Sequence, residues 1–157
     1  MQKITPCLWF DTQGEEAVNF YLSIFKDAKV TDVLRYGEGA PRPKGSVLTM
    51  TFEIEGQSFM VLNGGPEYTF NPAISLAVTC KTQEEVDHYW NRLVEGGSPV
   101  QCGWLTDKFG VSWQIVPTPL IDMLKDPDKA KAGRVMEAMM KMIKIDIPTL
   151  QKAYDGR

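Results

Sequence analysis

The sequence has little of the residue types that bind transition metals most strongly. It contains a single histidine, His88, and three cysteines, Cys7, Cys80 and Cys102, none of them in a CxxC spacing. Structural zinc sites combine several closely spaced Cys and His ligands, and a histidine-activated Ser or Cys nucleophile needs its histidine nearby. His88 lies within a predicted helix among polar residues, which favours a solvated surface role. We therefore expect no zinc site, no disulfide framework, and buried cysteine thiols.

An excess of positive charge and a long apolar run are also lacking. There are 17 Lys and Arg against 20 Asp and Glu, a net charge of -3. A nucleic-acid-binding surface needs a basic stripe that displaces counterions from phosphates. No apolar stretch has the length of a membrane span, and the first residues enter a strand without the hydrophobic segment of a signal peptide. We expect a cytoplasmic protein that binds neither nucleic acid nor membrane.

The most informative stretch that is present is residues 102–117, which predicts two strands joined by a turn at residues 107–110. Gly110 can adopt positive φ at this turn, and β-branched and aromatic residues flank it. The end of this stretch, residues 110–116 (GVSWQIV), matches residues 56–62 (GQSFMVL) position by position. This match indicates a duplicated module.

The first copy of the module reads as βαβββ. Strands are predicted at residues 4–10, 29–36, 46–54 and 57–63, and a helix at residues 15–25 has apolar residues at helical spacing. Residues 46–54 alternate as in a half-buried strand, and Glu55 and Gly56 form a hairpin turn into the next strand. Residues 37–45 hold three Gly and two Pro, which excludes regular structure and indicates a mobile loop or lid.

The second copy repeats this pattern after a linker. Strands are predicted at residues 74–80, 99–104 and 111–116, and a helix at 86–94 follows a capping box formed by Thr82 and Glu85. A shift of 69 positions places Glu15 on Glu84 and Tyr21 on Trp90. Helices are then predicted at residues 120–124, 129–144 and 145–154, the second capped by Asp128. The Met residues of this region fit helix packing better than a ligand groove.

These elements predict an α+β fold in one domain, residues 1–157. Module one covers residues 1–63, the linker 64–73, module two 74–117 and a C-terminal helical extension 118–157. The tandem βαβββ units, the aromatic pair late in each module's helix and the Gly-x-Ser-Trp-Gln-Ile ending resemble the glyoxalase/bleomycin-resistance/dioxygenase superfamily, the vicinal oxygen chelate proteins. Residues 102–117, 62–66 and 136–147 resemble its PhnB-like branch in particular.

The resemblance implies that each module's sheet curls into a half-barrel. In catalytic members a divalent metal is held on the concave face by His, Gln or Glu on the first and last strand of each module. The corresponding positions here are Pro6, Met60, Ser75 and Gln114. A neutral amide, a hydroxyl and a thioether are weak ligands for such an ion, so we expect no metal site and no cofactor.

A concave pocket that keeps a few polar groups suits a small organic ligand. The residues predicted to line it are Pro6, Leu8, Phe10, Met60, Ser75, Ala77, Thr79 and Gln114, with Trp104 near the rim. The alternative is that these side chains simply fill a small barrel. No catalytic residue can be assigned.

Three hypotheses for the function remain open, and they leave undecided whether the protein is an enzyme. The first is a metal-independent protein that binds a small apolar or aromatic molecule, expected from the resemblance to be a homodimer. The second is an enzyme, either a metal-dependent lyase, isomerase or dioxygenase, or a methyltransferase, as in the PhnB-like family label 3-demethylubiquinone-9 3-methyltransferase. No glycine-rich nucleotide-binding motif supports methyl transfer. The third is a non-catalytic assembly module that uses the Met-rich C-terminal helix.

Overall fold

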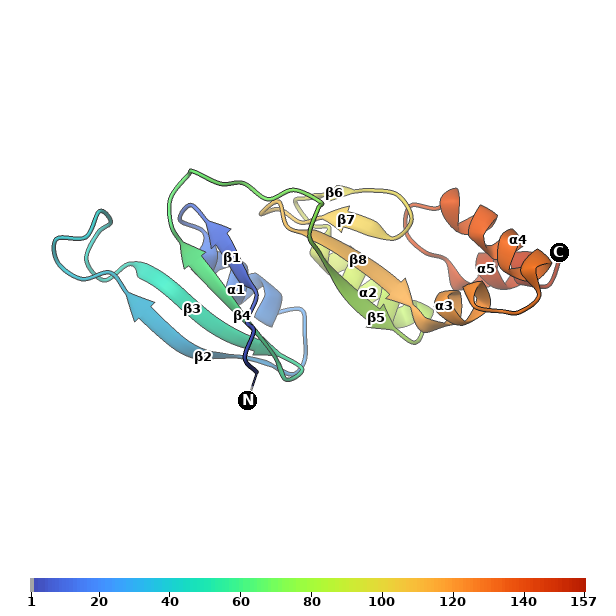
Figure 1. Ribbon diagram of the computed structural model, residues 1–157, viewed down its shortest axis with the longest axis horizontal. Helices are drawn as coiled ribbons and strands as arrows, with labels where there is room; N and C mark the ends of the chain where they lie inside the picture. Colours follow the sequence, from blue (N-terminus) through green and yellow to red (C-terminus); the bar gives the residue numbers. More distant parts are fainter. Residues whose placement is uncertain (1) are drawn as a thin grey trace. The chain divides into compact units, whose positions relative to one another are not determined.

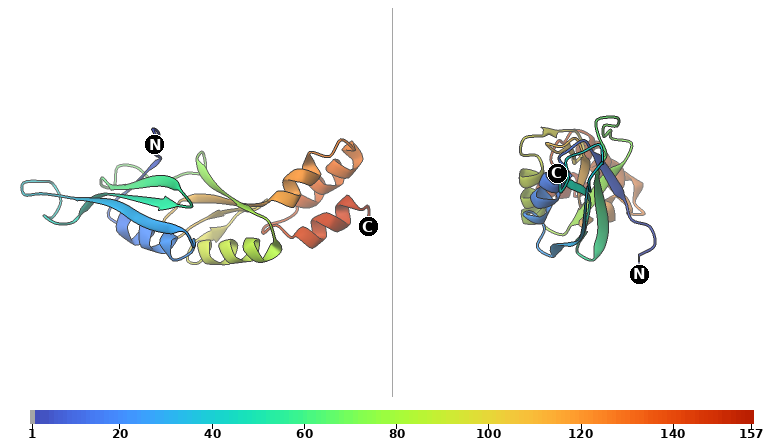
Figure 2. Two further views of the ribbon diagram at one scale, coloured as in Figure 1. Left: turned by 90° about the horizontal axis from the view of Figure 1, so that it is seen from below. Right: turned by 90° about the vertical axis from the view of Figure 1, so that its left-hand side faces the viewer.

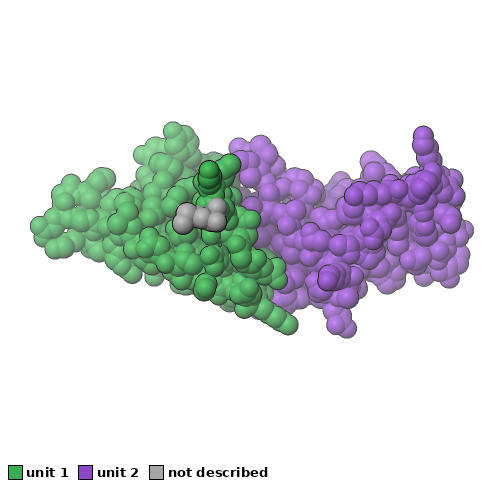
Figure 3. All heavy atoms as spheres, turned by 60° about the horizontal axis from the view of Figure 1, so that its bottom comes forward, with its two compact units in different colours: residues 1–70 green, residues 71–157 purple. Residues whose placement is uncertain are grey.

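The computed structural model describes residues 2–157, which divide into two compact units at the Phe70–Asn71 junction (Figure 3). Each unit is built around one four-stranded sheet and is described by itself (Figure 1). None of the helices in residues 2–157 has the length and apolar character needed to cross a membrane.

Unit 1 has the predicted βαβββ order. Its elements are β1 (Cys7–Phe10), α1 (Gly14–Leu22), β2 (Ala28–Arg35), β3 (Val47–Ile54) and β4 (Gln57–Asn63). The strand order is β1-β4-β3-β2, with β1 parallel to β4 and the other neighbours antiparallel. The β3–β4 turn is the predicted tight hairpin, in which Glu55 and Gly56 both have positive φ.

The core of unit 1 lies between α1 and one face of this sheet (Figure 2). β3 alternates as its sequence predicts, with Met50, Phe52 and Ile54 buried. On α1, Ala17, Val18 and Tyr21 are buried at helical spacing, and the Tyr21 ring stacks on Phe52 with centroids 6.3 Å apart. The sheet therefore has one face packed on α1 and one face that this helix does not cover.

Unit 2 repeats the same topology, with its counterparts of β2, β3 and β4 shorter than in unit 1. Its module consists of β5 (Ser75–Cys80), α2 (Gln83–Leu93), β6 (Ser98–Pro99), β7 (Trp104–Thr106) and β8 (Ser112–Pro117). The order β5-β8-β7-β6 matches β1-β4-β3-β2 strand for strand, and β5 pairs in parallel with β8. The duplication inferred from the sequence and the α+β class are thus confirmed. Neither sheet is curled, so the half-barrel shape implied by the resemblance is not seen within either unit.

The prediction of a single strand at residues 99–104 is wrong, because the structure has two short strands in that stretch. A turn at Cys102 and Gly103, both at positive φ, divides it into β6 and β7. A Cβ at Gly103 would lie 3.0 Å from the Ile115 carbonyl oxygen and 3.0 Å from Ile145 Cγ1. This turn therefore needs glycine for both its backbone conformation and its close packing.

Three helices follow the second module: α3 (Thr118–Leu124), α4 (Lys129–Met140) and α5 (Ile147–Tyr154). As predicted, the Asp128 side chain caps α4 by accepting from the backbone N–H groups of Ala130 and Lys131. The three helices and the segment between α4 and α5 share a small core of their own. Its buried members are Leu120, Met123, Val135, Ile145 and Leu150.

Helix α4 ends at Met140, before the predicted residue 144, because the next residues join the second module. The carbonyls of Met142 and Ile143 accept hydrogen bonds from the backbone N–H groups of Cys102 and Gly103, both 2.8 Å. Gln83 of α2 donates to the Ile145 carbonyl and accepts from the Ile147 N–H. The extension is thereby attached to unit 2 through its backbone.

Candidate functional site

Five of the predicted pocket residues lie together on one face of the unit 2 sheet. Gln114 pairs with Ala77 on one side and with Trp104 on the other, so these three side chains share a face. Gln114 Nε2 donates a 2.9 Å hydrogen bond to Ser75 Oγ. Thr79 lies on the same face, beside Val116.

This face is the one that α2 leaves uncovered. The neighbouring residues Leu105, Trp113 and Ile115 point to the other side and are buried, whereas Ala77 and Thr79 are exposed. The four residues Ser75, Thr79, Trp104 and Gln114 are called the Gln114 face below. Whether they bind a ligand stays a prediction.

The predicted residues of unit 1 do not all share a face. Met60 pairs with Cys7 and Thr51, on the side away from α1, and its N–H donates to the Pro6 carbonyl. Leu8 pairs with Val61, which packs against the start of α1 at Gly14.

Leu8 and Phe10 are therefore on the helix side of the sheet, 8% and 3% exposed. The sequence-based expectation places Leu8 and Phe10 on the same face as Met60. In the structure they lie on the opposite face of the sheet from Met60. The cause is the parallel register of β1, which pairs Met60 with Cys7 rather than with an even-numbered residue.

The four positions equivalent to metal ligands do not fit a divalent cation. Pro6 has no side-chain donor, Met60 has only a thioether, and the Ser75 hydroxyl and the Gln114 amide are bonded to each other. Within residues 2–157, no three His, Cys, Asp or Glu side chains gather in a way that could hold a metal.

The cysteines differ in exposure. Cys80 is fully buried, Cys102 is half-buried, and Cys7 is exposed, which corrects the expectation of buried thiols for Cys7. Burial, with a smaller contribution from the nearby Glu85 carboxylate, raises the pKa of the Cys80 thiol to about 11. Partial desolvation also raises the pKa of the Cys7 thiol, although the residue as a whole is exposed. Both thiols are protonated at neutral pH, which makes them weak nucleophiles.

Asp107 is a buried carboxylate, 2% exposed, whose structural role the sequence reasoning missed. Its Oδ1 accepts from the backbone N–H groups of Phe109 and Val111, and its Oδ2 accepts from Trp113 Nε1, all within 3.0 Å. An Asp that opens a turn ending in Gly is the available sequence signal. These contacts hold the β7–β8 hairpin that carries Trp104 and Gln114.

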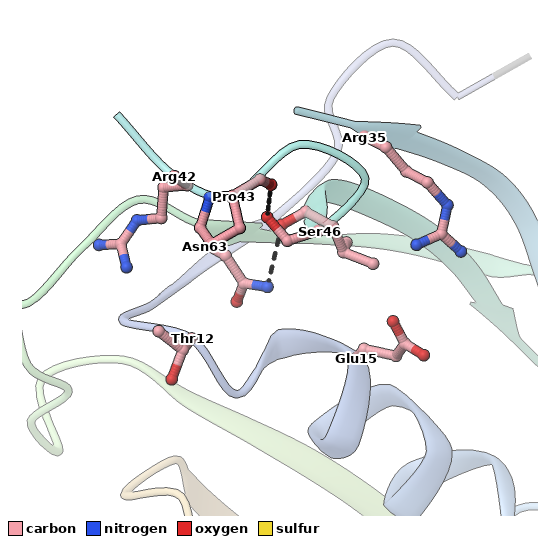
Figure 4. A pocket seen from close by; sticks show the side chains of 8 residues that line it. Thr12, Glu15, Arg35, Arg42, Pro43, Ser46 and Asn63 are labelled. Atoms are coloured by element: carbon pink, nitrogen blue, oxygen red, sulfur yellow. Dashed lines mark hydrogen bonds between the residues drawn. The ribbon is translucent and has the colours of Figure 1, made fainter. Parts of the chain in front are cut away.

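Unit 1 also contains a cavity of about 340 Å³ that the sequence did not predict (Figure 4). It lies between the start of α1, the end of β2 and the loop before β3, and is called the arginine pocket below. Its lining residues are Thr12, Glu15, Arg35, Arg42, Pro43, Ser46, Val47 and Asn63. The available signal was the Gly- and Pro-rich loop flanked by basic residues.

We compared the chain with known proteins and protein families. No curated protein matches the sequence. The family model described as 3-demethylubiquinone-9 3-methyltransferase matches residues 2–116, so the C-terminal helices lie outside the match.

Two solved structures resemble the chain over nearly their whole length. The PhnB protein from Bacillus cereus is 40% identical with a TM-score of 0.69, covering 74% of this chain and 99% of that one. Protein PA1353 from Pseudomonas aeruginosa is 21% identical with a TM-score of 0.63, covering 74% and 98%. As the resemblance in its sequence predicted, the chain belongs to the PhnB-like family, whose family model carries the description 3-demethylubiquinone-9 3-methyltransferase.

Proposed function

We propose that the protein binds a small apolar or aromatic molecule on the Gln114 face without a catalytic metal. The observation that carries this proposal is the hydrogen bond from Gln114 to Ser75 beside the half-buried Trp104. This bond orients the Gln114 amide so that its oxygen is left as an acceptor, and no group within residues 2–157 donates to it. A ligand with one donor can bond this oxygen while its ring packs on Trp104.

The surroundings of this pair suit an apolar ligand. The exposed Ala77 and Thr79 offer a floor of small side chains between Ser75 and the end of the strand. One or two polar groups within a mainly apolar surface are typical of sites for small organic molecules. The metal-dependent alternative would need stronger ligands than the thioether, hydroxyl and amide found at the equivalent positions.

The experiment is a two-dimensional amide NMR titration with 2-naphthol, a neutral planar aromatic with one hydroxyl donor. We expect saturable shifts in β5, β7 and β8, including the Gln114 side-chain amide and the Trp104 indole. Gln114→Ala should weaken binding by about tenfold, the usual cost of a well-placed hydrogen bond. Gln151→Ala, which removes an exposed glutamine of α5, is the matched control and should leave affinity unchanged.

Two further arms test the alternatives on the same sample. Stoichiometric binding of Ni²⁺ or Zn²⁺ that is lost in Gln114→Ala would overturn the metal-free proposal. Saturable binding of S-adenosylmethionine would support the methyltransferase named in the family description. An unperturbed Gln114 face in every titration would leave the assembly-module hypothesis as the better one.

We also propose that the protein is a homodimer, joined along β2. Every residue of this edge strand except the first is exposed, including the apolar Val30, Val33 and Leu34. An edge strand with exposed apolar residues and unpaired backbone groups favours a partner, and a second copy supplies a matching strand.

Leu34→Lys is expected to shift the sedimentation coefficient to that of a monomer. Ile74→Lys, which places the same charge on an apolar residue that is 77% exposed in unit 2, should remain a dimer. Dissociation of both variants alike, or a monomeric starting protein, would contradict a dimer through β2. A cytoplasmic location stays a prediction.

A further inference from the structure

The arginine pocket offers a second place for a ligand, in unit 1 and apart from the Gln114 face. We propose that it binds a small organic oxyanion, a carboxylate or phosphate group attached to a compact apolar body. All eight lining residues belong to unit 1, and none was among the residues predicted from the sequence to bind a ligand. The volume of about 340 Å³ is at the lower end of the range for small-molecule sites.

Two arginines line this pocket from different elements, Arg35 at the end of β2 and Arg42 in the loop before β3. Figure 4 shows Arg42 with Pro43 on one side of the pocket and Arg35 with Glu15 on the other. Arg35 donates to the Gly45 carbonyl at 3.0 Å, and Arg42 forms an ion pair with Asp11 at 3.3 Å. Each guanidinium carries five N–H donors, so these contacts position the two side chains and leave donors for an anion.

The loop that supplies Arg42 is attached at its base. Tyr36 and Ser46 form a backbone hydrogen bond of 2.9 Å, and Ser46 Oγ donates to the Pro43 carbonyl at 2.6 Å. The Tyr36 hydroxyl donates to the Asn63 carbonyl at 2.6 Å, which ties the loop to the end of β4. A pocket whose walls are held in this way loses little entropy when a ligand binds.

The lining chemistry limits what kind of anion fits. Val47, only 5% exposed, and Pro43 give the pocket an apolar wall for the ligand's body. The Glu15 carboxylate has no hydrogen bond or ion pair with any described residue, and it accepts a ligand hydroxyl. The first N–H of α1, that of Gly14, already donates to Asn63 Oδ1 at 2.8 Å. The arginines, and not the helix end, therefore supply the positive charge.

The test is an NMR titration of the full chain at low salt with two probes, benzoate and inorganic phosphate. We expect saturable shifts at Ser46, Val47 and the arginine side chains. Arg42→Gln and Arg35→Gln should each lower affinity about tenfold, as expected for a charge-assisted contact. Glu15→Gln should raise the affinity for benzoate about threefold, since it removes a negative charge facing the anion. Tight binding of only one probe identifies the preferred oxyanion.

Lys29→Gln is the matched control. Lys29 lies on the same strand as Arg35, its side chain is 72% exposed, and its substitution changes the net charge by the same amount. Its affinity should equal that of the unsubstituted protein. The Glu15→Gln result keeps the test decisive if an arginine variant disturbs the loop. No saturable shift up to about 20 mM probe, an equal loss in Lys29→Gln, or weaker binding in Glu15→Gln would each overturn the proposal. None of these outcomes bears on the Gln114 face.

Discussion

The two modules share one strand order but begin their helices in different ways. In unit 2, Thr82 directly precedes α2 and caps it, because its side chain accepts a hydrogen bond from the Glu85 N–H. In unit 1, Gln13 makes no such side-chain bond, and Asn63 at the end of β4 accepts from the Gly14 N–H instead. The comparison shows that one of the modules relies on a local cap and the other on a tertiary one.

Their loops differ as well. The connection from β2 to β3 in unit 1 is long and forms one wall of the arginine pocket. The corresponding connection in unit 2 is a short turn at Cys102 and Gly103, which bonds the C-terminal segment. Duplication thus kept the sheets and left the loops to acquire separate uses.

The largest expected effect is at the unit 2 hairpin. Asp107→Ala removes the acceptor of three hydrogen bonds and leaves the Trp113 indole N–H and two backbone groups without it. We expect the free energy of unfolding to fall by about 4 kcal/mol. Urea unfolding followed by circular dichroism measures this. Asp107→Asn, which keeps one carbonyl acceptor, should lose less; an equal loss in both would show that hydrogen bonds to a single retained oxygen contribute nothing to stability.

The capping difference can be measured directly. Asn63→Ala removes a buried side chain that bonds both the Gly14 N–H and the Val47 carbonyl, so we expect a loss of about 2 kcal/mol. Thr82→Ala removes a single exposed cap bond and should cost about 1 kcal/mol. Chemical denaturation of both variants gives the comparison. A larger loss for Thr82→Ala would contradict the distinction between tertiary and local caps.

The buried Cys80 of unit 2 should make the stability of the protein depend on pH in the alkaline range. The pKa of Cys80 is raised by burial to about 11 from an ordinary value of 9.0, so the folded state holds its proton longer than the unfolded state. The stabilisation is complete below pH 9 and is lost as the pH rises toward 11. The free energy of unfolding, measured by urea denaturation between pH 8 and about pH 11, should fall more steeply with pH in the unsubstituted protein than in Cys80→Ala.

Thiol labelling of the folded protein gives an independent check. A disulfide reagent at pH 8 should modify the exposed Cys7 of unit 1 and spare the buried Cys80. Equal labelling of the two residues would show that β5 opens readily.

The smallest expected effect is at the unit 1 hairpin. Glu55 has φ 48° and Gly56 φ 81°, the conformation that Asn-Gly turns prefer. Glu55→Asn should raise the free energy of unfolding by about 0.5 kcal/mol, because Asn tolerates positive φ better. Gly56→Ala should act in the opposite direction although nothing lies within 4 Å of the added Cβ. Thermal melts of the two variants should therefore shift in opposite directions.

Much of the fold could be read from local patterns. The alternation in β3, the hairpin at Glu55 and Gly56, and the caps at Thr82 and Asp128 were predicted because each depends on neighbouring residues alone. The repeated GxS motif and the constant offset between the helices identified the duplication and the family. The end of α4 was misplaced because the Met142 and Ile143 carbonyls bond residues 102 and 103, far away along the chain.

The candidate sites divide in the same way. Trp104 and Gln114 share a face because hairpin pairing places them opposite each other, and strand alternation places Ser75 and Thr79 on one side of β5; both patterns can be read from sequence. That this side of β5 is also the Gln114 side depends on the parallel register of β5 against β8. The side on which Leu8 and Phe10 lie depends on the register of β1 against β4, and a shift of one residue reverses it.

By itself, the sequence determined the tandem modules, their helices and strands, and the weak donor set at the four positions equivalent to metal ligands. Only the tertiary structure decided the register of β1, the buried role of Asp107 and the meeting of Arg35, Arg42 and Glu15 around one cavity. The physical reason is that these features arise from contacts between segments distant in the chain, which local propensity and periodicity do not encode.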